Sequence, residues 1–432
     1  MENRRVIQNS LNYIEENLKT EITANELADL AGFSLFHYYR LFHTLVGMPI
    51  MQYITHRKLL NALYEIGCGS KIIDVALEYG FETHAGFYRA FKREFGYTPS
   101  SFLKKFKTKK PYKINLFEEE HIMVSHKKIS ELLKYWNLEK ETISDIYYES
   151  SGNKSNNSYY VGTDYVIKFT PHLGKLKNHI VLSKSIENVG LFAATPIKTK
   201  DDSEYVQNGE LYFCLTRRLD GRQINADDMY EGDYKEKARF VGEIIGQLHL
   251  ALEKADAAVN EVNLYENVVN WALPKAKELL NLPDKLCNDY QGTFGKLYTN
   301  LPIQIIHRDP NPGNIICNND KWGFIDFELS EKNLRIYDPC YAATAILSES
   351  FSEHDPSKFG KWLEMYQNII YGYDNVVKLR EEEYKSLPYV ILSNQLICVA
   401  WFSEQEKYKD MLEINQEMTN WLIANFDKLK ID

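Results

Sequence analysis

The stretch GFETHAGFYRAFKREFGYTPSSF, residues 80–102, carries the strongest structural signal in this 432-residue sequence. Gly80-Phe81 predicts a tight turn, and Thr83 can cap a helix in which apolar residues recur at helical spacing as far as Phe95. The apolar residues between 72 and 77 predict a short helix before the turn. These features together predict a helix-turn-helix unit.

A second unit of the same kind lies about 50 residues upstream. Thr23-Ala24-Asn25-Glu26 has the spacing of a capping box, Gly32-Phe33 predicts the turn, and Ser34 can cap a helix that ends near Leu45. A longer helical stretch that contains Arg57 separates the two units. About seven short helices are therefore expected between Arg4 and Phe106.

Two units at this spacing, with the ending quoted above, resemble the AraC/XylS family of transcription regulators over residues 7–106. The resemblance implies that one domain places two recognition helices in successive major-groove segments of double-stranded DNA. It assigns the DNA-facing positions to Phe36, Tyr39, Arg40, His84, Ala85 and Arg89. It assigns the inward positions to Tyr38, Leu41, Phe42, Phe87 and Phe91. Tyr38 replaces the family's usual leucine, and Gly86 inside a helix costs about 1 kcal/mol relative to alanine.

The charge distribution separates this part from the rest of the chain. Residues 1–110 hold 15 Lys and Arg against 11 Asp and Glu, whereas the remainder holds 36 against 49. A basic segment within a chain of net charge −9 is the expected footprint of a nucleic-acid partner. Charge-rich stretches at 107–113 and 117–121 predict a linker over residues 108–124, between a domain at 1–107 and another at 125–432.

The second domain contains IHRDPNPGNIICNNDKWGFIDFE, residues 306–328. His307, Asp309 and Asn314 fit the pattern H-x-D-x-x-x-x-N, and Asp326 follows Asp309 by 17 residues on the expected returning strand of a β-hairpin. Phosphoryl transfer to a hydroxyl group needs a carboxylate near the acceptor and oxygen ligands for Mg²⁺. Asp309 suits the first role, as a catalytic base. Asn314 and Asp326 suit the second, as metal ligands.

This pattern resembles the aminoglycoside phosphotransferase and choline kinase superfamily over roughly residues 127–432. The resemblance implies a protein-kinase-like fold that uses ATP or GTP with Mg²⁺. It assigns nucleotide contacts to Lys168, Thr216 and Leu219, and the loop over the nucleotide to residues 151–160. The helix after Lys168 should supply a glutamate that orients this lysine, but the sequence offers only His179 or the more distant Glu187.

The predicted fold class is a multidomain one: an all-α double helix-turn-helix domain plus a two-lobed α+β kinase-like domain. A hydrophobic content of 44% with 26% charged residues is typical of a soluble globular protein. The sequence shows neither an apolar run of roughly 18 residues nor a secretory leader, which predicts a cytoplasmic bacterial protein without a membrane partner. The six scattered cysteines indicate neither a disulfide framework nor a zinc site.

Two functions stay open, together with the oligomeric state. The first is a DNA-binding transcription regulator whose C-terminal domain senses a nucleotide or a small-molecule ligand. The second is an ATP-dependent kinase of a small hydroxyl compound with an attached DNA-binding domain. Intact Lys168, Asp309, Asn314 and Asp326 favour catalysis, whereas the missing glutamate favours sensing. A regulator requires a contact surface between its domains, which we expect on the nucleotide-binding lobe because this lobe comes next along the chain.

Overall fold

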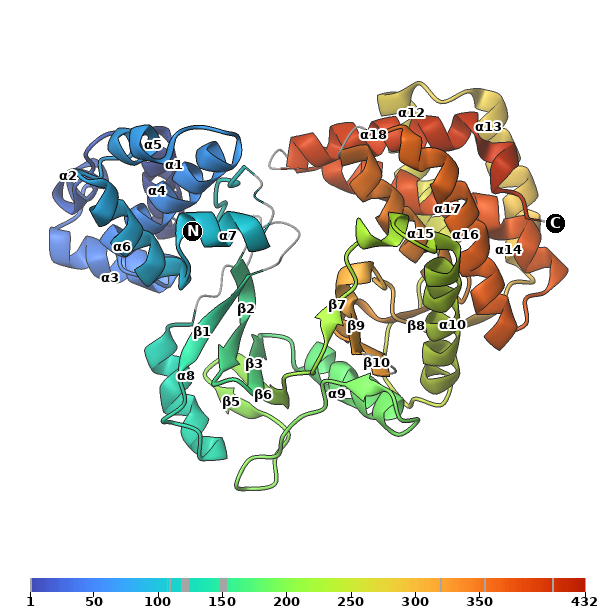
Figure 1. Cartoon of the computed structure of the whole chain (residues 1–432), viewed down its shortest axis with the longest axis horizontal. Helices are drawn as coiled ribbons and strands as arrows, with labels where there is room; N and C mark the ends of the chain where they lie inside the picture. Colours follow the sequence, from blue (N-terminus) through green and yellow to red (C-terminus); the bar gives the residue numbers. More distant parts are fainter. Residues whose placement is uncertain are drawn as a thin grey trace. The chain divides into compact units, whose positions relative to one another are not determined.

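The computed structural model describes residues 2–106, 108, 110–117, 124–147, 154–318, 321–352, 355–405 and 408–431 (Figure 1). The chain forms two compact units. The first comprises Met1–Pro171 and Pro196–Arg218, and the second comprises His172–Thr195 and Leu219–Asp432. The first unit therefore combines the helix-turn-helix region with the small sheet that follows it.

The first unit begins with seven helices, as the sequence predicts for the residues up to 106. They are α1 (Glu2–Glu16), α2 (Ala24–Leu30), α3 (Leu35–Val46), α4 (Ile50–Gly67), α5 (Ile72–Glu78), α6 (His84–Phe95) and α7 (Pro99–Lys105). The predicted caps are confirmed. The Thr23 hydroxyl accepts a hydrogen bond from the backbone N–H of Glu26 at 3.2 Å, and Ser34 and Thr83 cap α3 and α6 in the same way. Local hydrogen bonds thus fix where both recognition helices start.

The helices enclose one apolar core. Tyr38, Phe42, Phe87 and Phe91 are buried in it and Leu41 packs against it, so the predicted inward face is confirmed. Gly86 lies in the first turn of α6, where a Cβ atom would come within 3.1 Å of the Thr83 hydroxyl oxygen. The glycine therefore makes room for the cap, which offsets part of its cost in helix propensity.

The rest of the first unit is a five-stranded antiparallel sheet with the helix α8 (His126–Leu133) and a 3₁₀ turn, η1 (Lys134–Trp136). The strands lie in the order β1 (Ile143–Tyr147), β2 (Lys154–Val161), β3 (Tyr165–Thr170), β6 (Leu211–Arg217) and β5 (Val206–Asn208). One face of the sheet packs with α8 through a core that includes Ile167 and Leu215. Lys168 is paired with Cys214, and Val166 with Thr216, so these four side chains share the opposite face.

The second unit is mostly helical, with short strands near its centre. Its helices are α9 (Leu173–Glu187), α10 (Tyr234–Leu252), α11 (Leu264–Asn267), α12 (Leu273–Leu280), α13 (Asp284–Asp289), α14 (Gly295–Tyr298), α15 (Tyr337–Ser352), α16 (Ser357–Val376), α17 (Glu381–Ser403) and α18 (Lys409–Ala424). Its short 3₁₀ and π turns are η2 (Asp228–Tyr230), η3 (Val268–Ala272), η4 (Tyr290–Phe294), η5 (Pro312–Asn314), η6 (Phe327–Leu329) and η8 (Phe426–Leu429). One sheet has the order β4 (Phe192–Ala193), β10 (Lys321–Phe324), β9 (Ile315–Asn318) and β7 (Arg222–Gln223), and β11 (Glu331–Leu334) pairs with β8 (Ile303–Ile306).

The helix α17 is the central helix of this unit. Its length and composition would allow it to cross a membrane, but 72% of its most apolar window is buried inside the protein. Leu387, Val390, Leu396 and Val399 on this helix belong to the main core of the second unit. Burial against α15 and α18 therefore accounts for its apolar sequence.

Candidate DNA interface and phosphotransferase site

The six residues predicted to face DNA all lie on the exposed sides of α3 and α6. Phe36 is 73% exposed, and the Arg40 guanidinium lies over its ring at 5.9 Å. In α6, His84, Ala85 and Arg89 are exposed, and the Arg89 side chain donates a hydrogen bond to the Ala85 carbonyl at 3.3 Å. The two recognition helices thus present aromatic and cationic side chains to solvent, as base-edge or phosphate contacts require.

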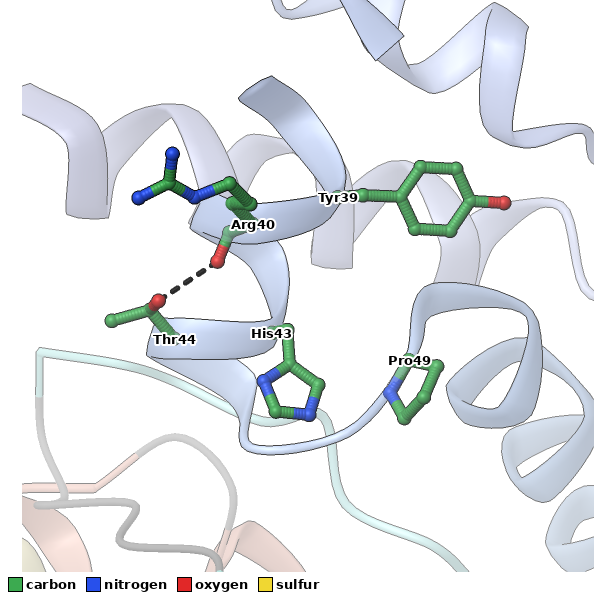
Figure 2. A pocket seen from close by; sticks show the side chains of 5 residues that line it. All are labelled: Tyr39, Arg40, His43, Thr44 and Pro49. Atoms are coloured by element: carbon green, nitrogen blue, oxygen red, sulfur yellow. Dashed lines mark hydrogen bonds between the residues drawn. The ribbon is translucent and has the colours of Figure 1, made fainter. Parts of the chain in front are cut away.

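Figure 2 shows a shallow hollow beside α3 that is lined by Tyr39, Arg40, His43, Thr44 and Pro49. The Thr44 hydroxyl donates a hydrogen bond to the Arg40 carbonyl at 2.8 Å. His43 and Thr44 were not predicted from the sequence. They follow Tyr39 and Arg40 by four residues, so helical spacing alone could have placed them on the same face.

The predicted catalytic base, Asp309, is held by two neighbouring amides in the second unit. The Asn311 side chain donates to the Asp309 carboxylate at 2.8 Å. The Asn314 side chain donates to the Asp309 carbonyl at 2.9 Å and to its carboxylate at 3.2 Å. These bonds fix the orientation of the carboxylate before any substrate arrives, as a general base requires.

A buried polar network holds the backbone of the same loop. The Asp338 carboxylate is fully buried and accepts hydrogen bonds from the backbone N–H groups of His307 at 2.8 Å and Arg308 at 3.0 Å. The same carboxylate lies 2.9 Å from the His249 ring, whose other nitrogen is 2.8 Å from the Tyr373 hydroxyl. Arg308 has a φ of 76°, a strained conformation for an arginine that this network can maintain.

The two predicted metal ligands lie at the same end of a hairpin. Ile315 pairs with Phe324, and the Ile325 N–H donates to the Asn314 carbonyl at 3.0 Å, so Asn314 and Asp326 lie at the same end. The prediction that Asp326 lies on the returning strand is wrong, because β10 ends at Phe324 and Asp326 has a φ of 67°. This left-handed conformation cannot continue an extended strand.

Asn314 and Asp326 fit a magnesium ion that arrives with a nucleotide. Both bear the oxygen atoms that Mg²⁺ prefers, and phosphate oxygens usually complete its coordination. Among the residues that the structure describes, no group of three or more His, Cys, Asp and Glu side chains could hold a metal ion. A magnesium ion held by these two residues would take its remaining ligands from phosphate oxygens and water.

The predicted nucleotide contacts are divided between the two units. Lys168 and Thr216 lie on the face of the first unit's sheet that points away from α8, and Leu219 begins the long segment of the second unit. Residues 151–153 of the expected nucleotide loop lie outside the described residues, and residues 154–160 belong to β2.

The two alternatives for the lysine-orienting position have partners inside the second unit. The His179 ring lies 6.1 Å from the ring of Phe327, directly after Asp326. Glu187 accepts a hydrogen bond from Thr195 at 3.1 Å. The first helix of the second unit thus packs against the segment that follows the predicted metal ligand.

Two further side chains near Asp309 were not predicted. Burial and the negative charge of the nearby Asp309 carboxylate raise the pKa of Tyr341 well above its ordinary value. Burial also raises the pKa of the Cys398 thiol to about 11, and the charges of Arg308 and Asp309 act on it in opposite directions. The helices α15 and α17 thus contribute to the surroundings of Asp309.

Comparisons with known proteins match two separate segments of the chain. Residues 27–105 match the family described as a helix-turn-helix domain, and residues 149–372 match the phosphotransferase enzyme family. The HTH-type transcriptional activator AarP of Providencia stuartii is 33% identical over 98 residues, which are 22% of this chain and 73% of that protein. The uncharacterized HTH-type transcriptional regulator YbfP of Bacillus subtilis is 36% identical over 110 residues, 24% of this chain and 37% of that protein.

A solved microcompartment-associated aminopropanol kinase superposes with a TM-score of 0.52 at 14% identity, over 70% of this chain and 98% of the kinase chain. At this identity the superposition shows a common fold only. The chain spans about 37% of the length of YbfP, so the match to that protein is confined to a part of it. Both resemblances stated from the sequence, to AraC-type regulators and to small-molecule phosphotransferases, are confirmed.

Proposed function

Because the chain belongs to the phosphotransferase enzyme family and carries a DNA-binding domain of the AraC type, we propose that it is a transcription regulator whose kinase-like domain senses a ligand. The ligand is a nucleotide, a small molecule or both, and its binding changes the affinity of the helix-turn-helix domain for DNA. A sensor needs a physical connection to the part that it controls. The contact surface within the first unit supplies this connection.

The observation that carries the proposal is an aromatic cluster shared by the two domains. Tyr147, the last residue of β1, places its ring 5.7 Å from Phe95, 5.6 Å from Phe102 and 6.2 Å from Phe106. Phe95 ends the recognition helix α6, and Phe102 lies on α7. We call these four residues the Tyr147 cluster. Through it, the first strand of the kinase-like domain packs against the core of the DNA-binding domain.

The segment predicted as a linker also packs against the DNA-binding domain where the structure describes it. The Gln8 side chain donates to the Ile114 carbonyl at 2.9 Å and accepts from the Leu116 N–H at 2.7 Å. The Arg57 guanidinium donates to the Tyr112 carbonyl at 2.8 Å. Residues 112–116 therefore have defined contacts, which a freely moving tether would lack.

The position of Tyr147 places the cluster next to the predicted nucleotide loop. Tyr147 is followed directly by residues 148–153, which connect β1 to β2 and overlap the loop assigned to the nucleotide. Asp145, two residues earlier, forms an ion pair with Lys154 at 2.8 Å and a hydrogen bond with the His126 ring at 3.0 Å. These contacts anchor the start of the loop to the sheet and to α8. A ligand bound at this loop would act on Tyr147 and, through the Tyr147 cluster, on α6.

The experiment measures the affinity of the full chain for its own promoter region with and without Mg-ATP or Mg-GTP. Fluorescence anisotropy gives the two dissociation constants. Both are measured at the same salt concentration, because salt alone changes DNA affinity steeply. We expect a 5- to 150-fold difference, equivalent to about 1–3 kcal/mol of coupling. By reciprocity, promoter DNA must change nucleotide affinity by the same factor. Equal DNA affinities with and without both nucleotides would contradict the proposal.

A kinase activity of the same site is the second candidate, and the hydrogen bonds that orient Asp309 favour it. In such a reaction Asp309 would accept the proton of the acceptor hydroxyl, Lys168 would bind phosphate oxygens, and Asn314 with Asp326 would hold Mg²⁺. Bound Mg-nucleotide supplies the phosphoryl group. Release of ADP or GDP that depends on an added hydroxyl compound would establish turnover, and this readout is separate from the DNA measurement.

A further inference from the structure

We propose that Asn394, on α17, binds the small-molecule ligand beside Asp309 and selects a compact neutral compound that bears hydroxyl groups. This inference rests on the proposed function, because it requires the kinase-like domain to bind a small molecule. It goes further by naming a residue and a ligand class. Three observations support it: the state of the Asn394 amide, its place on α17, and the chemistry of its neighbours.

The Asn394 amide is buried without partners. The residue is 1% exposed, and neither its amide nitrogen nor its oxygen has a hydrogen-bond partner among the described residues. The adjacent Ser393 is equally buried, yet its hydroxyl bonds to the Tyr290 hydroxyl at 2.6 Å and to the Tyr389 carbonyl at 2.7 Å. A buried amide without partners destabilises a fold relative to an apolar side chain of similar size. A ligand that satisfies this amide gives a reason for its presence.

The helix places Asn394 next to the predicted site. Asn394 and Cys398 are four residues apart, so they lie on the same face of α17. Cys398 is half-buried and is close enough to Asp309 and Arg308 for their charges to act on its thiol. The helix α15 packs against α17 and also contacts η5 (Pro312–Asn314), the turn that follows Asp309. On this face of α17, Cys398 is half-buried near Asp309, and Asn394 is fully buried one turn away.

The chemistry of this face defines the ligand class. Asn394, Cys398 and Tyr341 are uncharged, and an amide can both donate to and accept from a hydroxyl group. Arg308 has its own partners, because it forms an ion pair with Glu331 at 3.0 Å and lies over the Tyr337 ring at 4.4 Å. Selection of a polycation would need additional carboxylates on this face, since a buried charge requires an opposite charge. The face thus fits a polyol or a sugar better than an amine-rich compound.

The test uses the full chain with Mg-ATP or Mg-GTP present and measures its melting temperature. The probes are myo-inositol, D-glucose and glycerol as neutral polyols, with choline and kanamycin as cations. We expect at least one neutral probe to raise the melting temperature of the wild type, and none to raise that of Asn394→Leu. Without a probe, Asn394→Leu should melt a few degrees higher than the wild type, because it removes the unsatisfied amide. Ser393→Ala is the matched control and should melt lower while keeping the response to the probe.

The outcomes separate this inference from the proposed function. A lower melting temperature of Asn394→Leu without a probe would show that the amide is structural and would overturn the inference. So would an unchanged response to the probe in that variant, or a wild type that responds only to the cations. If Asn394→Leu gives too little folded protein, Asn394→Asp is measured instead and should transfer the response from the neutral probes to choline. If the probe response depends on Asn394 but no ligand changes DNA affinity, the site stands and the regulator proposal fails.

Discussion

Replacing Tyr147 with alanine should uncouple the kinase-like domain from DNA binding. The ring makes three aromatic contacts with the DNA-binding domain, at 5.6 to 6.2 Å between ring centroids. Each such pair contributes about 0.5–1.5 kcal/mol beyond its buried area, so three pairs contribute roughly 1.5–4.5 kcal/mol. This energy is as large as the 1–3 kcal/mol that typically couples two binding sites. Loss of the ring should therefore remove most of the effect of the ligand on DNA affinity.

Tyr147→Phe is the matched control, since it keeps the ring and removes the hydroxyl. That hydroxyl donates to the Asp145 carboxylate over 3.4 Å, a long hydrogen bond whose loss should cost little. Promoter affinity is measured by fluorescence anisotropy for the wild type and both variants, with and without saturating Mg-nucleotide, after thermal unfolding has shown that each protein is folded. The wild type and Tyr147→Phe should show the 5- to 150-fold ratio, and Tyr147→Ala a ratio close to one. A folded Tyr147→Ala variant with the ratio of the wild type would refute the assignment of coupling to the Tyr147 cluster.

Arg40→Ala or Arg89→Ala should weaken specific promoter binding by about 1–3 kcal/mol without changing the melting temperature, because both side chains are exposed. An equal loss on promoter and unrelated DNA, measured by gel shift, would instead assign them to phosphates. Burial raises the pKa of Asp145, but its ion pairs outweigh burial and hold that pKa at about 2, below the ordinary 3.8. The resulting stabilisation of roughly 2 kcal/mol is present above about pH 4 and is lost as the pH falls toward 2. The free energy of unfolding, measured from urea curves by circular dichroism at several pH values, should fall between about pH 4 and pH 2 in the wild type and fall less in Asp145→Asn. An equal fall in both proteins would contradict this assignment. Asp326→Ala should abolish Mg-dependent nucleotide binding in a calorimetric titration, whereas Asp309→Ala should retain binding and lose only turnover. Unchanged binding by the first variant would exclude its role as a metal ligand.

The sequence predicts those features whose cause is local. The caps of α2 and α3 are formed by Thr23 and Ser34, whose hydroxyls accept from the N–H group three residues further on. Asp309 and Asn314 are five residues apart, and the loop between them is short enough for a direct hydrogen bond. In each of these bonds the donor and the acceptor belong to the same turn or loop, so a short sequence pattern includes both partners. These elements could therefore be placed without a structure.

The features that were not predicted depend on partners far along the chain. Tyr147 lies in an ordinary strand pattern, and its neighbour Phe95 is 52 residues away. Asn394 lies in the apolar run LPYVILSNQLICVAW, residues 387–401, where nothing in the sequence distinguishes an amide with partners from one without. Chain order predicted a contact with the lobe that comes next along the chain, and Tyr147 of β1 does contact Phe95. The residues that make the contact follow only from tertiary packing.

The order of the domains decides which recognition helix the ligand can affect. The helix α6 has the residues predicted to face DNA, His84, Ala85 and Arg89, toward its start and Phe95, in the Tyr147 cluster, at its end. Arg89 and Phe95 are separated by roughly 9 Å along a rigid helix, so a displacement at Phe95 must move Arg89 as well. The helix α3 contributes no residue to the Tyr147 cluster. Simultaneous binding in two major-groove segments requires α3 and α6 to keep one relative orientation. A ligand that displaces Tyr147 would therefore change DNA affinity through α6 and its half of the operator, without unfolding either helix-turn-helix unit.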